Sequence, residues 1–189
     1  MTFTVVYDAN VLFPAPLRDL LIRVALTGLV RARWTGEILD ECFANVLRQR
    51  PDLSEASLCR TRELMNRAVR DCLVTGYEPL IAGLELPDPG DCHVLAAAIR
   101  AGAQAIITFN LKDFPDSVLA PLGIEAKHPD EFILETIDLA PGAVCGAVAE
   151  QARVLRNPPR RVGELLDTLG NQGLTRSVAK LRELFGLTV

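Results

Sequence analysis

The sequence is poor in aromatic residues and in histidine. Aromatic side chains make up 5% of its 189 residues, and it has 2 histidines. So few aromatic side chains argue against a surface that binds nucleic-acid bases mainly by stacking. His93 and His128 do not have the spacing of a metal-binding pair, and we expect both to be structural or exposed.

The cysteines and the apolar runs exclude further classes of protein. The 5 cysteines form no C-x-x-C pair and their number is odd, which argues against a disulfide framework and a thiolate zinc site. No apolar run approaches the roughly 18 residues of a membrane span. The net charge of −4 gives no overall attraction to nucleic acid. The expectation is a soluble, cytoplasmic protein without a membrane partner.

Short apolar strands alternate with helices along most of the chain. The hydrophobic fraction of 49% is ample for a buried core. Runs rich in β-branched and apolar residues predict strands at 3–7, 103–108 and 124–127. Helical periodicity and capping signals predict helices at 17–28, 35–50, 53–73, 92–102 and 129–139. This alternation is typical of a parallel sheet covered on both faces, so the predicted fold class is α/β.

The remaining segments predict how the chain is divided. Residues 30–34 are expected to form a brief extended link, and residues 77–86 an irregular or extended approach to the next helix. From residue 141 onward only helices are predicted. We therefore expect one α/β domain over residues 1–138 and a helical extension over residues 139–189.

Acidic side chains stand near the ends of the first two predicted strands. Asp8 follows the first strand, Asp91 opens the helix that leads into the second, and Asp113 comes shortly after the second. In parallel α/β sheets, ligands bind beyond the carboxyl ends of the strands. If these two strands are neighbours, the three carboxylates converge, and Glu41 from the helix at 35–50 can reach them as a fourth.

Carboxylates that crowd together have a restricted chemistry. They repel one another, so they either keep raised pKa values or hold a cation. An all-oxygen set of ligands favours Mg²⁺ or Mn²⁺ over zinc. Such an ion activates water and neutralises charge on phosphoryl oxygens, which suits hydrolysis of a phosphodiester.

Four segments together resemble the PIN domain over residues 3 to about 138. They are "VVYDANVL", "TGEILDECFANV", "PDPGDCHVLAAAIRAGAQAIITFNLKDFP" and "GIEAKHPDEFI". The T-x-N-x-x-D-F pattern looks like that of one branch of the VapC-type toxin ribonucleases. The C-terminal helices look like the extension of the longer, VapC50-like members of that branch.

The resemblance implies both a fold and a function. The fold is a three-layer α/β/α PIN-like domain with a central parallel sheet, followed by the C-terminal helices. The function is an Mg²⁺- or Mn²⁺-dependent endoribonuclease, the toxin of a type II toxin–antitoxin system. Its expected partners are an RNA substrate and a cognate antitoxin protein, with a homodimer as a further expectation.

The resemblance also implies roles for individual residues. The catalytic and metal-binding roles fall on Asp8, Glu41 and Asp91. Many family members have aspartate where this chain has Asn110, so we assign the fourth acidic role to Asp113.

Three uncharged residues are expected to lie near the RNA. They are Asn10, Thr108 and Asn110. Asn110 would act as a neutral ligand or orient a water molecule. Thr108 is equally well explained as a β-branched strand residue, and Asn10 as a turn residue that bonds to the backbone.

Several acidic positions keep more than one interpretation. Either Asp88 or Asp91 could cap the helix at 92–102, and capping is compatible with metal binding. Glu37 and Asp40 are rivals of Glu41 for the helix position.

Arginines on the helices at 35–50 and 53–73 could guide RNA or form solvated helix faces. They are Arg48, Arg50, Arg60, Arg62, Arg67 and Arg70.

Two other classes of function remain open at the level of sequence. A HAD-like phosphatase would also use a strand-end aspartate, with Asp8 as the nucleophile that accepts the phosphoryl group. Against it, the residue two positions further on is Asn10 and not an acid. A non-catalytic PIN-like binding module would instead receive an arginine from a partner in its acidic pocket.

Overall fold

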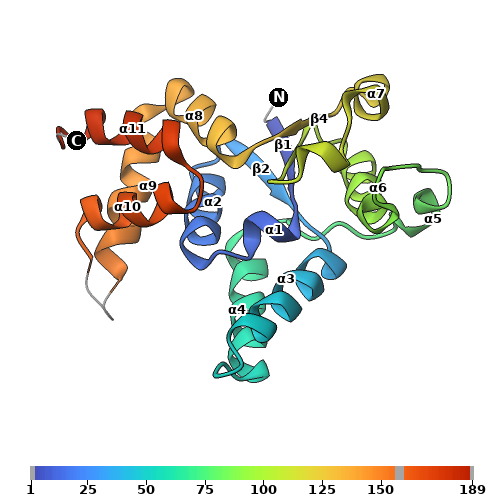
Figure 1. Cartoon of the computed structure of the whole chain (residues 1–189), viewed down its shortest axis with the longest axis horizontal. Helices are drawn as coiled ribbons and strands as arrows, with labels where there is room; N and C mark the ends of the chain where they lie inside the picture. The colour runs from blue at the N-terminus through green and yellow to red at the C-terminus, as the bar shows by residue number, and fades with distance from the viewer. Residues whose placement is uncertain (1–2, 156–159, 188–189) are drawn as a thin grey trace.

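The computed structural model describes residues 3–155 and 160–187, and within these a four-stranded parallel sheet forms the centre of the molecule (Figure 1). The strands are β1 (Phe3–Tyr7), β2 (Val30–Arg33), β3 (Ala105–Ile107) and β4 (Glu125–Lys127). They are arranged in the order β2-β1-β3-β4, with all pairs parallel. This arrangement confirms the predicted parallel sheet.

β1 and β3 are neighbours, which is the condition for the acidic side chains to converge. Val5 pairs with Ala105, and Tyr7 pairs with Ile107. The backbone N–H of Asp8 continues this ladder by donating to the carbonyl oxygen of Ile107 at 3.1 Å. The residues that follow both strands therefore lie at the same edge of the sheet.

The segment predicted as a link at residues 30–34 contains β2 instead. Val30 and Ala32 are buried on one face of the strand, while Arg31 is exposed on the other. This period of two identifies a strand at the edge of the sheet. The sequence did not predict this strand, because its arginines interrupt the apolar run that marks the central strands.

Helices follow most strands, and their bounds refine the prediction. Those in the first part of the chain are α1 (Ala9–Leu12), α2 (Ala15–Leu26), α3 (Gly36–Gln49), α4 (Glu55–Ala68), α5 (Glu78–Ile81), α6 (Cys92–Ala101), α7 (Asp116–Leu119) and α8 (Pro129–Leu139). The part of the chain that the structure describes also has 3₁₀ turns at Pro89–Asp91, Leu111–Asp113 and Ala120–Leu122.

Two of the predicted segments are corrected by these bounds. The approach at residues 77–86 contains the short helix α5. The helix predicted over 53–73 ends at Ala68, since Val69 is extended and Asp71 has a φ of 55°, which a continuing helix does not allow.

The sheet lies between helices on its two faces. The Tyr7 hydroxyl donates to the carbonyl oxygen of Leu21 in α2 at 3.2 Å, and the Tyr7 ring contacts Phe132 of α8 edge-on at 6.1 Å between centroids. α6 covers the other face, on the opposite side of β1 from α2 (Figure 1). Its fully buried alanines, among them Ala96 and Ala98, allow close approach. This is the predicted three-layer α/β/α fold.

The C-terminal helices α9 (Pro141–Val154), α10 (Val162–Asn171) and α11 (Thr175–Leu184) pack together beside α8 and α2 (Figure 1). Gln151 of α9 donates to the carbonyl oxygen of Pro16 at 2.8 Å, which ties α9 to the start of α2.

In the described residues no single helix is long and apolar enough to cross a membrane. α8 and α9 qualify only as a pair, which is bent by 120°.

Candidate active site

Asp8 lies at the carboxyl edge of the sheet, directly after β1, and is 4% exposed. Its Oδ1 accepts the backbone N–H of Ala9 at 2.6 Å. Its Oδ2 accepts both the Asn10 side-chain amide at 2.6 Å and the Thr108 hydroxyl at 2.7 Å. Burial raises the pKa of Asp8, although the bonds from Thr108 and Ala9 oppose this; the charge of Glu41 raises it further. The carboxylate is therefore fixed in place.

Asn10 and Thr108 join the ends of β1 and β3. The Asn10 amide donates to the Thr108 hydroxyl at 2.9 Å, and its Oδ1 accepts the backbone N–H of Phe109 at 3.0 Å. The Thr108 hydroxyl oxygen accepts the backbone N–H of Asn110 at 3.0 Å. Both residues thus position Asp8 and the loop after β3. The Asn110 side chain is exposed at the start of that loop.

Asp91 lies among other acids. Burial raises its pKa to about 6, and the negative charges of Asp8, Asp88, Asp113 and Glu41 contribute in that order. Three of the acids predicted for the site, Asp8, Asp113 and Glu41, therefore lie near enough to Asp91 for their charges to affect its pKa.

The capping role near α6 belongs to Asp88. Its Oδ1 accepts the backbone N–H of Gly90 at 2.8 Å, which starts the 3₁₀ turn before the helix. Asp91, by contrast, makes no side-chain capping bond to the described residues. The ambiguity between these two aspartates is thus resolved, and the Asp91 carboxylate is left without a helix-capping bond.

Glu41 is held by a residue whose role the sequence did not reveal. His93 of α6 is 4% exposed, and its Nε2 lies 3.1 Å from the Glu41 Oε1. Burial alone lowers the pKa of His93, but the hydrogen bond and charge of Glu41 and the charges of Glu37 and Asp8 raise it overall. We expected His93 to be structural or exposed. It is buried and connects α6 to Glu41.

The two rivals of Glu41 have other partners. Glu37 Oε2 accepts the hydroxyl of Tyr77 at 3.0 Å and lies 3.7 Å from the Nδ1 of His93. Asp40 forms an ion pair with Arg62 of α4. Glu41 is thus the acid of α3 whose charge reaches both Asp8 and Asp91.

The donors fit a hard divalent cation by chemistry and by charge. The four acids Asp8, Glu41, Asp91 and Asp113 offer oxygen ligands only. Burial and, after it, the charges of the neighbouring acids raise the pKa of Asp91, and a bound cation would offset both effects by stabilising the ionised carboxylate. Within residues 3–155 and 160–187, however, no three His, Cys, Asp or Glu side chains are already gathered tightly enough to hold an ion.

A HAD-like use of Asp8 is not supported by its surroundings. Both of its carboxylate oxygens are occupied by donors from Ala9, Asn10 and Thr108. The residue two positions further on, where a HAD-like phosphatase has an acid, is Asn10, whose amide donates to Asp8. The contacts of Asp8 instead favour a carboxylate that is held still.

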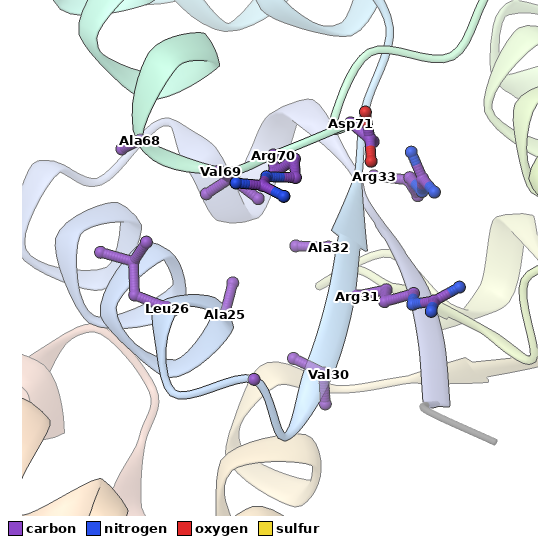
Figure 2. Close-up of a pocket in the computed structure, with 11 residues that line it drawn as sticks. Ala25, Leu26, Val30, Arg31, Ala32, Arg33, Ala68, Val69, Arg70 and Asp71 are labelled. Atoms are coloured by element: carbon purple, nitrogen blue, oxygen red, sulfur yellow. The ribbon is translucent and has the colours of Figure 1, made fainter.

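A cavity of about 440 Å³ lies beside β2 (Figure 2). Ala25 and Leu26 of α2 lie across it from Ala32, whereas Arg31 and Arg33 project from the other side of the strand. None of the predicted site residues, all of which lie in the described part of the chain, lines this cavity. It is therefore not the candidate active site.

Comparison with known proteins identifies the class of protein. Residues 4–112 match the family described as PIN domain, and residues 129–183 match that described as VapC50 C-terminal domain. Because the first match spans more than half of the chain, the protein belongs to the PIN-domain family. The resemblance seen in the sequence is thereby confirmed. The division at residue 138 stays a prediction.

One curated relative is similar over part of the chain. It is "Putative ribonuclease VapC50" of Mycobacterium tuberculosis (strain ATCC 25618 / H37Rv), 43% identical over 110 residues. The matched stretch covers 58% of this chain and 64% of the relative, so the chain spans less than two thirds of the relative's length. No solved structure matches the chain with significant similarity.

Proposed function

We propose that the protein is an Mg²⁺- or Mn²⁺-dependent endoribonuclease. The observation that carries this proposal is the group of acids around Asp91, which interact strongly enough to help raise its pKa to about 6. They come from different elements, and the residues that follow β1 and β3 share the carboxyl edge of the sheet, where ligands of α/β proteins bind. The similarity to a relative named as a ribonuclease supports RNA as the substrate.

Asp8, Glu41, Asp91 and Asp113 would hold the ion. Bound Mg²⁺ or Mn²⁺ supplies Lewis acidity, which favours deprotonation of water and offsets negative charge on the phosphodiester. Asp8 is kept in one orientation by its hydrogen bonds, and His93 keeps Glu41 turned toward the cluster. Asn110, exposed at the start of the loop after β3, is available to the RNA.

The wider biological role is also part of the proposal. We infer that the protein is the toxin of a type II toxin–antitoxin system, because it is similar to the relative named VapC50 over 110 residues and because residues 129–183 match the VapC50 C-terminal domain. A cognate antitoxin protein would then be its inhibitor, and cellular RNA as substrate implies a cytoplasmic location. A homodimer is an additional proposal that sedimentation analysis can test.

The decisive experiment replaces one carboxylate. Asp8→Asn keeps the size of the side chain but removes its charge, so we expect Mn²⁺-dependent cleavage of a mixed RNA pool to be abolished while the fold is retained. Asp138→Asn, at an exposed position of α8, is the matched control and should cleave like the wild type. Cleavage by purified Asp8→Asn protein at the wild-type rate would reject the nuclease assignment. Inactive wild-type protein would leave the non-catalytic binding module.

A further inference from the structure

A second cavity, of about 510 Å³, lies between the α1 region and the C-terminal part of α3. It is lined by Asn10 and Phe13 from the α1 region and by Asn45, Arg48 and Gln49 from α3. A volume of this size lies within the range of small-ligand sites. Asn10 also donates to Asp8, so one lining residue belongs to both the cavity and the candidate active site.

The helix α3 connects the cavity to Glu41 by a second route. Asn45 is four residues after Glu41, and Arg48 and Gln49 are seven and eight residues after it. Residues at these spacings share one face of a helix. The cavity therefore begins about one helical turn, ~5.4 Å, from Glu41 along the axis of α3.

The lining combines three kinds of contact that suit a nucleotide. Phe13 is half-buried and presents an aromatic ring. Asn45 and Gln49 present carboxamides, which donate and accept hydrogen bonds. Arg48 is exposed and donates to the Asn45 side-chain oxygen, which orients that amide.

The charge of Arg48 remains available to a ligand. In the part of the chain that the structure describes, Arg48 forms no ion pair, whereas Arg50 pairs with Asp52 and Arg62 pairs with Asp40. A guanidinium group at the rim of an otherwise neutral cavity suits a phosphate. The net charge of the protein is −4, so this positive group is a local feature.

We propose that this cavity binds one nucleotide of single-stranded RNA, next to the phosphate that lies over the acids. The base packs against Phe13, its edge is read by Asn45 and Gln49, and Arg48 contacts the adjoining phosphate. Unstacked RNA bases are recognised in this way, by aromatic stacking and by hydrogen bonds to their edges. The low aromatic content does not oppose this, because a subsite for one base needs one ring. The inference rests on the proposed ribonuclease function.

The first experiment maps cleavage sites. Wild type, Asn45→Ala and Gln49→Ala are incubated with an RNA pool of randomised sequence and Mn²⁺, and the cut ends are sequenced. We expect the wild type to prefer certain bases at one position beside the cut. That preference should fall about tenfold in the variants, since each lost amide contact removes base discrimination. Unchanged preference in both variants of an active enzyme overturns the subsite while leaving the nuclease assignment intact.

A binding measurement decides the matter even if no cleavage is seen. Fluorescence anisotropy with a short labelled RNA, without metal, compares wild type with Phe13→Leu, Gln49→Ala and Arg48→Ala. Arg31→Ala is the control, because Arg31 is an exposed arginine of β2 that lines the other cavity. We expect each of the three subsite variants to weaken binding at least about threefold and the control to leave it unchanged. Equal affinity in all of them, with unaltered thermal melting, overturns the inference.

Discussion

Asp91 and Asp130 both stand at the beginning of a helix, yet their surroundings are opposite. Asp130, in the first turn of α8, is 6% exposed and accepts the backbone N–H groups of Arg176 and Ser177 and the Ser177 hydroxyl, at 2.6–3.0 Å. Burial alone raises the pKa of Asp130, but the bonds from Ser177 and Arg176 lower it overall. The pKa of Asp91 is raised to about 6.

The difference shows what separates a structural carboxylate from a candidate functional one. The charge of Asp130 is satisfied by three donors, which fasten α11 to α8. Asp91 faces other acids, and so does little for the stability of the protein without metal. An acid whose charge is unfavourable in the folded protein without a ligand is a candidate for binding a ligand. Substitutions of Asp91 and of Asp130 test this difference.

The largest expected effect is on cleavage by Asp91→Asn. The change removes a charged oxygen ligand but conserves shape, so we expect RNA cleavage to fall more than about 100-fold, beyond the usual loss for a residue that only supports a ligand. Initial rates on a labelled RNA in Mn²⁺ measure this. A rate within tenfold of wild type would show that Asp91 is not part of the metal site.

Asp130→Ala should give the largest loss of stability. The backbone N–H and the hydroxyl of the buried Ser177 would lose their acceptor, which costs about 1 to 3 kcal/mol, whereas the N–H of the exposed Arg176 can turn to water. Urea denaturation followed by circular dichroism measures it, with Asp138→Ala as the control at an exposed position of the same helix. RNA cleavage per folded molecule should stay near wild type. A loss below 0.5 kcal/mol, on the order of an ordinary surface change, contradicts the structural role of Asp130.

Local signals in the sequence predicted part of the fold and of the candidate site. The central strands and the acids Asp8 and Asp91 were predictable, because apolar runs and strand-end positions are local signals. The edge strand β2 was not, since Arg31 and Arg33 conceal its alternation. From the sequence, the acids were expected to converge only if their two strands were neighbours. β1 and β3 are paired, so this condition is met.

Contacts between distant residues could not be predicted at all. His93 bonds to Glu41 across 52 residues, and Asp130 to Ser177 across 47 residues. A histidine in the apolar run "CHVLAAA" was the available signal, because a buried imidazole needs a polar partner. Nothing in the sequence identified that partner as Glu41, since the choice depends on how α3 and α6 pack.

His93→Ala should have an intermediate effect. Without the imidazole, the Glu41 carboxylate loses its 3.1 Å contact and becomes free to rotate, so we expect kcat to fall about tenfold with KM little changed. His93→Gln keeps an N–H donor and should recover part of the loss. Tyr77→Phe, which removes only the bond to Glu37, is the control. Steady-state kinetics that show equal kcat for His93→Ala and wild type would remove His93 from the site.

The smallest effect is a dependence of stability on pH, and its sign differs between the two aspartates. The folded-state pKa of Asp91, about 6, lies above the ordinary value of 3.8, so without metal the folded protein holds that proton more tightly than the unfolded chain. Its contribution to stability is present below pH 4 and is lost as the pH rises through 6. Asp91→Asn should therefore melt slightly higher than wild type at pH 7.5 and equally at pH 3.5.

The Asp91 side chain is partly exposed to solvent, so screening keeps the gain in Asp91→Asn below about 1 kcal/mol. For Asp130 the folded-state pKa is lowered, so its stabilisation is present above pH 3.8 and disappears as the pH falls through the folded value. Asp130→Asn should then lose most stability at neutral pH, where Asp91→Asn gains it. Melting curves in EDTA at several pH values separate the two. Mn²⁺ should raise the melting temperature of wild type and Asp130→Asn, but not that of Asp91→Asn, because only a folded state with an intact site binds the ion.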